Sequence, residues 1–394
     1  MPSSPRARDS QARYSHAGDP RARDLGADDS RARDPRARDL GLPLPGTPGP
    51  HNAITDVPGV HVGQTTLIEG EAVRTGVTAI LPRPPATVED PCAAGWYSLN
   101  GNGEMTGTAW LSETGTLRLP VLVTNTHAIG PAHRGVIDWA VREKPRIAEE
   151  WLLPVVAETW DGYLNAINAP TVQPHHAVAA IDAARTGPVA EGSVGGGTGM
   201  NCYGFKGGNG TASRRVDYGA QTYTVGAFTQ ANFGSRRELT ICGTRVGPEL
   251  SADNPMEDSA RHQPPGSGSV IVVIATDAPL LPQQCTALAR RVPLGLARTG
   301  TSGSHFSGDL FLAFSTANED AFGSGMGFPQ GEPGYGELRF IPWNRMDAFY
   351  EAVVEAVEEA VLNVLVASRS MTGRDGHRSP GMPVDEVLRL VGVR

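Results

Sequence analysis

Hydrophobic positions along the chain fall into short runs, separated by turns rich in Gly, Pro and Asn. Runs of this kind predict strands over 59–67, 77–81, 119–124, 223–234, 269–278 and 310–315. Helical spacing predicts helices over 136–141, 177–184 and 282–291. The continuous apolar stretch 270–275 indicates a sheet that is covered on both faces. Strands and helices therefore interleave in one continuous α/β domain.

A longer helix is predicted over 346–365. Its apolar side chains recur at helical spacing on one face, at positions 349, 353, 357, 360, 361 and 364. Four glutamates lie mostly on the opposite face, at positions 351, 355, 358 and 359. Asn344 is the predicted N-cap, and Asp347 falls in the first turn.

The N-terminal tract repeats the tetrapeptide Arg-Ala-Arg-Asp, which begins at residues 6, 21, 31 and 36. Large apolar side chains are almost absent from this tract, so it cannot bury enough surface to offset its ordering entropy. Residues 1–38 are predicted to be a disordered low-complexity tail, and 39–394 the folded domain. We interpret the upstream repeats as a duplication of the domain start at Arg36 rather than as a functional arm.

Charge and composition limit the partners and the cellular compartment that we expect for this protein. The net charge is −8, and the first forty residues hold nine Arg against seven Asp, which leaves −10 on the rest of the chain. Such a balance disfavours nucleic acid and anionic membranes as partners. The chain contains no apolar run of eighteen residues, no apolar leader and only four widely spaced cysteines. We expect a soluble cytoplasmic protein with reduced thiols.

The sequence does not contain the common motifs for nucleotide or metal binding. In GSVGGGTGMNCYGFKGGNGT (192–211), Met200 stands where a dinucleotide fingerprint needs its third glycine, and Phe205 precedes Lys206 where a phosphate loop needs glycine. The chain has no H-E-x-x-H motif and no G-x-S-x-G elbow. No cofactor or metal is therefore expected. The glycines serve either close backbone packing or the approach of backbone amides to a substrate.

The stretch PPGSGSVIVVIATDAPL (264–280) raises a different chemistry. Its loop-like start ends in Gly268-Ser269, where the strand begins. A serine at such an edge is commonly a turn residue. However, the open carbonyl of Gly268 also permits attack by the Ser269 hydroxyl if the peptide is strained. An N-to-O acyl shift and hydrolysis would then free an α-amine, with a pKa of roughly 7.7–8.0. Hydroxyl and amine together form a nucleophile with its own base.

Several motifs together resemble the L-aminopeptidase D-Ala-esterase/amidase family, which includes the β-peptidyl aminopeptidases. They are PVVAETWDGYLN, GSVGGGTGMNCYGFKGG, VGAFTQANFG and residues 269–318, in that order, after the opening RARDLGLPLPGTPGPHNAITDVPGVHVGQTTL. The resemblance implies a single-domain αββα sandwich that cleaves itself into two associated chains, 1–268 and 269–394. It also implies a hydrolase that acts on N-terminal residues, and assembly into homotetramers.

The same resemblance assigns roles to individual residues. It places the nucleophile at Ser269, with cleavage after Gly268, and a second serine and acid at Ser307 and Asp309. Family members with β-aminopeptidase activity commonly have Glu in the acid position, so Asp309 is one methylene shorter. The oxyanion donor falls on Asn232 and an active-site lysine on Lys206; the alternatives are a turn residue and a surface lysine. Glu158 is the candidate for the substrate ammonium. Tyr163 is a candidate hydroxyl near the oxyanion, although the family tyrosine also aligns with Trp160.

The main hypothesis is an autoprocessing serine aminopeptidase that releases N-terminal L-, D-Ala- or β-amino acyl groups from peptides, amides or esters. One alternative is an autoprocessing acyltransferase on a similar scaffold, although such enzymes usually cleave before Thr. The other alternative is a non-enzymatic small-molecule binding protein. Residue spacing does not decide the substrate, because specificity depends on pocket shape.

Overall fold

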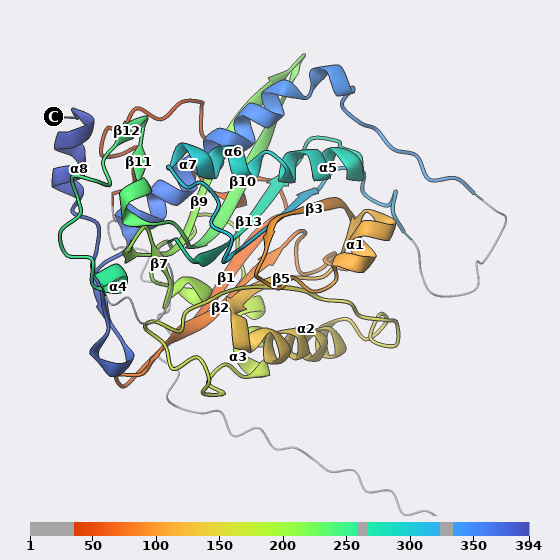
Figure 1. Cartoon of the computed structure of the whole chain (residues 1–394). Helices are drawn as coiled ribbons and strands as arrows, with labels where there is room; N and C mark the ends of the chain where they lie inside the picture. The colour runs from red at the N-terminus through yellow and green to blue at the C-terminus, as the bar shows by residue number, and fades with distance from the viewer. Residues whose placement is uncertain (1–34, 259–265, 324–333, 394) are drawn as a thin grey trace, which may run out of the picture. The chain divides into compact units, whose positions relative to one another are not determined.

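Two main β-sheets lie face to face, and helices cover the outer face of each (Figure 1). The computed structural model describes residues 35–258, 266–323 and 334–393. One cluster of buried apolar side chains fills the space between the two sheets. A second cluster lies between one sheet and the helices that cover it, and a third lies between the other sheet and its helices. This arrangement confirms the predicted αββα sandwich.

The first sheet has the strand order β1-β2-β5-β6. Its strands are β1 (His61–Glu69), β2 (Val73–Leu81), β5 (Val121–Asn125) and β6 (Val155–Thr159). Its outer face is covered by α2 (Ile129–Glu143) and α3 (Pro174–Asp182). Every residue of β5 and β6 is buried, because the second sheet covers one face of these strands and helices cover the other.

The second sheet has the order β4-β3-β14-β13-β10-β9. Its strands are β3 (Cys92–Gly101), β4 (Thr116–Leu117), β9 (Gly208–Tyr218), β10 (Gln221–Asn232), β13 (Gly268–Thr276) and β14 (Ser307–Ser315). Its outer face is covered by α5 (Pro282–Ala289), α6 (Val292–Arg298) and α7 (Asp347–Ala367). Strands β13 and β14 run parallel, and β13 pairs antiparallel with β10.

Short elements complete the described chain. They are α1 (Thr108–Thr114), α4 (Pro255–Asp258), α8 (Val384–Val391) and the two-stranded pairs β7 (Asn201–Cys202) with β8 (Phe205–Lys206), β11 (Thr240–Ile241) with β12 (Thr244–Arg245), and β15 (Met371–Thr372) with β16 (Arg378–Ser379). Among the helices of the described ranges, none has both the length and the apolar character needed to cross a bilayer.

Helix α7 differs from its prediction at its start and on its polar face. Asn344 lies in the preceding 3-10 turn (Trp343–Arg345) and does not cap the helix, which begins at Asp347. Most of the glutamate face is buried: Glu359 is 0% exposed, Glu355 and Glu358 are nearly as covered, and Glu351 alone of the four is exposed. The prediction failed because the chain that covers this face comes from distant parts of the sequence.

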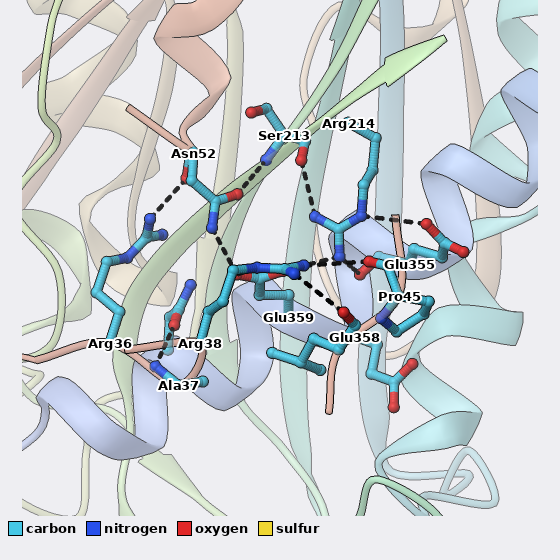
Figure 2. Close-up of polar contacts among 12 residues, drawn as sticks. Arg36, Ala37, Arg38, Pro45, Asn52, Ser213, Arg214, Glu355, Glu358 and Glu359 are labelled. Carbon is cyan, nitrogen blue, oxygen red and sulfur yellow. Dashed lines mark hydrogen bonds and ion pairs between the residues drawn. The ribbon is translucent and has the colours of Figure 1, made fainter. Parts of the chain in front are cut away.

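Arginines from two distant segments pair with these glutamates (Figure 2). The Arg38 guanidinium donates to Glu359 at 2.8 Å. Arg214 of β9 bonds Glu355 at 3.1 Å and Glu359 at 2.8 Å. Asn52 also donates to Glu359, and together these partners lower the pKa of that carboxyl despite its burial. We call Arg38, Asn52, Arg214, Glu355 and Glu359 the α7 ion cluster.

The folded unit begins at Pro35, four residues before the predicted boundary. Ala37 is fully buried, and its N–H donates to Asn363 of α7 at 3.0 Å. Arg36 forms an ion pair with Glu191 at 2.7 Å. The predicted tail was therefore too long by residues 35–38, because contacts with distant partners order a segment that has little apolar surface of its own. The upstream repeats at 6, 21 and 31 lie outside the described residues.

Candidate functional site

Ser269 lies at the start of β13, between the two sheets, and its side chain is buried. Its Oγ accepts a hydrogen bond from the backbone N–H of Trp160, which directly follows β6, at 3.0 Å. The Asn232 amide at the end of β10 donates to the same oxygen at 3.4 Å. Two N–H donors therefore converge on one hydroxyl oxygen, an arrangement that stabilises negative charge at that point.

Gly268 packs directly against β10. A Cβ atom at this position would lie 2.0 Å from the Asn232 carbonyl oxygen, so no larger residue fits there. The Gly268 N–H donates to the Phe306 carbonyl at 3.2 Å. The neighbouring strands thus hold the Gly268-Ser269 peptide on both sides.

Asn232 is the last residue of β10 and the cross-strand partner of Ser269, so it is not a turn residue. Its Oδ1 accepts the backbone N–H of Asn201 at 2.9 Å. This contact occupies the amide oxygen, and it leaves the NH₂ group facing Ser269.

Lys206 is fully buried, which rules out the surface-lysine alternative. Its Nζ donates to the carbonyls of Met200 and Gly207, both at 2.8 Å. These bonds hold the open end of the β7–β8 hairpin together, and β7 carries Asn201, whose N–H orients the Asn232 amide. Burial lowers the pKa of Lys206 to about 7, against an opposing charge from Asp161.

Asp161 is a buried carboxyl that the sequence analysis did not single out. It follows Trp160, and its Oδ1 accepts from the Asn165 amide at 3.0 Å. Burial raises its pKa to about 7. A lone Asp inside ETWDGYLN carries no spacing signal, although that motif itself was noted.

Ser307 and Asp309 lie on β14, where Gly308 pairs with Ser269. The Ser307 hydroxyl donates to Asp309 Oδ1 at 2.5 Å, and the amide of Asn100 donates to Oδ2 at 2.9 Å. Burial raises the pKa of Asp309, whereas donation from Ser307, Asn100 and the Val270 N–H lowers it. Among the described hydrogen bonds, none joins Ser307 or Asp309 to the Ser269 side chain. These two residues are brought beside Ser269 through the backbone of the paired strands.

Glu158 of β6 is buried close to the same place. Its carboxylate accepts the backbone N–H of Glu104 at 3.0 Å and the hydroxyl of Thr126. A Cβ added to Gly103 would lie 3.2 Å from Glu158 Oε1 and 2.9 Å from the Cα of Gly308. Glu158 is therefore separated by one glycine from the strand that flanks Ser269. Burial raises its pKa.

Tyr163 faces a different neighbour. Its hydroxyl donates to the Arg378 carbonyl at 3.3 Å, and its ring stacks on His377 with 4.7 Å between centroids. The structure therefore does not bring this hydroxyl to Ser269, and the nearer residue is Trp160, through its backbone N–H.

Metal ligands are not grouped in this part of the molecule. Over residues 35–258, 266–323 and 334–393, no three His, Cys, Asp or Glu side chains are arranged to hold a metal ion.

Comparisons with known proteins show the family of the chain. The chain matches peptidase family S58 over residues 52–379. It is 46% identical over 366 residues to the beta-peptidyl aminopeptidase BapA of Sphingosinicella microcystinivorans, covering 89% of this chain and 90% of that protein. The structure of a Burkholderia sp. beta-aminopeptidase superposes with a TM-score of 0.82 at 45% identity, over 91% of this chain and 99% of that one. The L-aminopeptidase D-Ala-esterase/amidase of Ochrobactrum anthropi, described as a new variant among the Ntn hydrolase fold, gives 0.84 at 44% identity with the same coverage.

Proposed function

Because this chain belongs to peptidase family S58 and is an aminopeptidase of the hydrolase class, we propose that Ser269 is its nucleophile, freed when the Gly268-Ser269 bond breaks. The observation that carries this proposal is the convergence of two N–H donors on Ser269 Oγ at the Gly268-Ser269 junction. The acyltransferase and the non-enzymatic alternatives are not retained, since the matched family and relatives are peptidases.

Processing would proceed within the chain. Ser269 Oγ attacks the Gly268 carbonyl carbon, the peptide C–N bond breaks, and the nitrogen takes up the hydroxyl proton. Water then hydrolyses the resulting ester. The products are a carboxylate on Gly268 and a free α-amine on Ser269, which gives an α-chain of residues 1–268 and a β-chain of residues 269–394.

In the processed enzyme, the α-amine of Ser269 accepts the proton of its own hydroxyl while Oγ attacks the substrate carbonyl. The Asn232 amide and the Trp160 N–H, which contact Ser269 Oγ, are the proposed donors to the negative oxygen that forms on the substrate carbonyl, and one such donor is typically worth about 3 kcal/mol. The bond between the carbonyl carbon and the leaving amine or alcohol then breaks, and the leaving group takes up the proton from the α-ammonium. Water, deprotonated by the same amine, hydrolyses the acyl-enzyme ester and restores the Ser269 hydroxyl.

Ser307 and Asp309 orient the amine-bearing residue. The Val270 N–H that contacts the Asp309 carboxylate belongs to the residue next to Ser269, which supports this role. Lys206 acts through the hairpin that carries Asn201, and it supplies positive charge next to the site when protonated.

Substrates carry a free N-terminal amine, which Glu158 holds by a charge-assisted hydrogen bond. They are peptides, amides or esters with an L-, D-Ala- or β-amino acyl end. Tyr163 is reassigned from the oxyanion to the support of the β15–β16 segment, since its hydroxyl is bonded to Arg378. In its place, the Trp160 N–H supplies the second oxyanion donor.

The processed units are proposed to form homotetramers in the cytoplasm. Exposed aromatic side chains at Trp110 and Trp151 support association with further copies, and the free cysteines of the described chain support a reducing compartment. Light scattering of the purified protein would give the assembly.

A panel of aminoacyl p-nitroanilides tests the proposed function. The wild-type protein should release p-nitroaniline from at least one of the L-Ala, D-Ala and β-Ala compounds. Ser269→Ala should stay a single chain and lose activity by more than roughly 1000-fold, because it removes the attacking group of both reactions. The neighbouring variant Ser267→Ala is the matched control and should behave as wild type. Retained hydrolysis by Ser269→Ala would exclude this serine as the nucleophile.

A further inference from the structure

Asn100 is the cross-strand neighbour of Asp309 in the pairing of β3 with β14. The pairing shifts at this point: Asp309 lies opposite Asn100, but Leu310 lies opposite Ser98, so β3 has one extra residue, Leu99. A bulge of this kind redirects the side chains beside it. Here the amide of Asn100 meets the acid of the site.

The two hydrogens of the Asn100 NH₂ group have separate acceptors. One acceptor is Asp309 Oδ2 at 2.9 Å, and the other is the carbonyl of Ser304 at 3.0 Å. Ser304 belongs to the loop that leads into β14. Asn100 therefore ties the acid and its incoming loop to β3, and its amide plane is fixed from both sides.

Asp309 is only 4% exposed, so its carboxylate depends on protein donors in place of water. Ser307 occupies Oδ1 and Asn100 occupies Oδ2. Ser307 lies on the same strand as the acid, whereas Asn100 comes from the part of the chain before residue 268. After processing, this contact would join the two chains at the active site.

We infer that Asn100 is a positioning residue of the aminopeptidase reaction: its amide fixes the Asp309 carboxylate so that the other oxygen receives the Ser307 hydroxyl. This inference rests on the proposed role of Asp309. In this inference Asn100 acts on the reaction through Asp309 and not through a contact with the substrate.

Asn102 is a matched control on the same segment. Its amide donates to the Phe306 carbonyl at 3.1 Å, in the same loop that Asn100 holds through Ser304. Both asparagines thus tie β3 to this loop, but the contact with Asp309 belongs to Asn100. A purely structural role predicts similar effects for the two alanine variants.

The test is the pH dependence of kcat/KM for Asn100→Ala, Asn102→Ala and Asp309→Ala. Loss of a donor to the carboxylate raises the pKa of Asp309, and the ionised form is the one that accepts from Ser307. Below the acid limb that the Ser269 α-amine sets, protonation of Asp309 produces a second, lower break, and this break should lie about one pH unit higher in Asn100→Ala than in wild type, with kcat about tenfold lower and KM within about twofold at neutral pH. Asn102→Ala should follow the wild-type profile.

Asn100→Asp keeps the size of the side chain and adds a second carboxylate beside Asp309, so this lower break should move further than in Asn100→Ala. This variant also serves if Asn100→Ala does not fold. The inference on Asn100 would be overturned if the pH profiles of both Asn100 variants coincided with the profile of Asn102→Ala. In that case, loss of activity in Asp309→Ala would still support the proposed role of the acid. Full activity in Asp309→Ala would overturn both.

Discussion

Two regions within the described residues stabilise buried charged groups in opposite ways. In the α7 ion cluster, carboxylates meet guanidinium groups directly, and the pKa of Glu359 falls below its usual value. Around Ser269, the pKa of Asp161 rises and that of Lys206 falls, each to about 7, and the pKa values of Glu158 and Asp309 rise. The first region keeps its charges by pairing them, whereas the second holds groups close to a change of protonation.

This difference separates a structural role from a chemical one. Paired buried charges are costly to break but do not need to titrate, so they hold segments together. Groups with pKa values displaced by burial are typical of sites that transfer protons or bind charged substrates. Variants of the α7 ion cluster should therefore change stability, and variants near Ser269 should change catalysis.

The largest effect on stability is expected from Arg214→Met. This substitution removes the guanidinium partner of Glu355 and one of the two guanidinium partners of Glu359. Because buried carboxylates then lose their countercharge, the free energy of unfolding should fall by about 3–5 kcal/mol. Urea unfolding in the Ser269→Ala background measures this change in one chain. The exposed pair Arg134–Asp138 of α2 provides the control, since Arg134→Ala should cost only about 0–1 kcal/mol. Equal losses in the free energy of unfolding for the buried and the exposed pair would contradict the structural role assigned to the α7 ion cluster.

Asn232→Ala should lower kcat roughly 100- to 1000-fold, because it deletes a donor to the reacting oxygen. The buried Asn363 of α7 is the control. Its alanine variant loses contacts with Ala37 and Thr211, and it should lower stability while kcat stays near wild type. Steady-state kinetics and thermal unfolding of both variants give the comparison. A kcat loss in Asn363→Ala as large as in Asn232→Ala would show that any buried amide has this effect.

Glu158→Gln should raise KM about 10- to 100-fold, since a neutral amide replaces the charged acceptor of the substrate ammonium. Glu358→Gln, which alters a buried glutamate of α7, should leave KM unchanged. Initial rates over a range of substrate concentrations separate KM from kcat. An unchanged KM in Glu158→Gln would place the ammonium elsewhere.

Measured per pH unit, the smallest effect concerns pH and Lys206. Because burial holds the pKa of Lys206 at about 7 in the folded chain, against 10.5 for an ordinary exposed lysine, unfolding takes up a proton between these pH values. Lys206 thus makes the free energy of unfolding rise with pH across this window, by at most about 1.4 kcal/mol per pH unit. Lys206→Met should lack this rise, whereas Lys144→Met, at the other lysine, should retain it. Parallel slopes for wild type and Lys206→Met would contradict the burial of this charge.

Local patterns in the sequence predicted the elements that depend on them. The run 269–278 corresponds to β13 and the pattern over 346–365 to α7, while the sandwich and the two-serine site came from the family resemblance. The surroundings of a side chain that depend on distant segments could not be predicted from local patterns. The glutamates of α7 were assigned to its polar face, Asn232 was interpreted as a turn residue without the resemblance, and Asp161 and Asn100 were not identified. In each case the partner that defines the residue's surroundings lies far away in the sequence, or on another strand.

The measurement that tests the central claim most directly is the intact mass of active, purified protein, together with the N-terminal sequence of its fragments. We predict two polypeptides that correspond to residues 1–268 and 269–394, the second beginning with Ser269, and one uncut chain for Ser269→Ala. Fully active protein that consists only of the uncut chain would contradict the account.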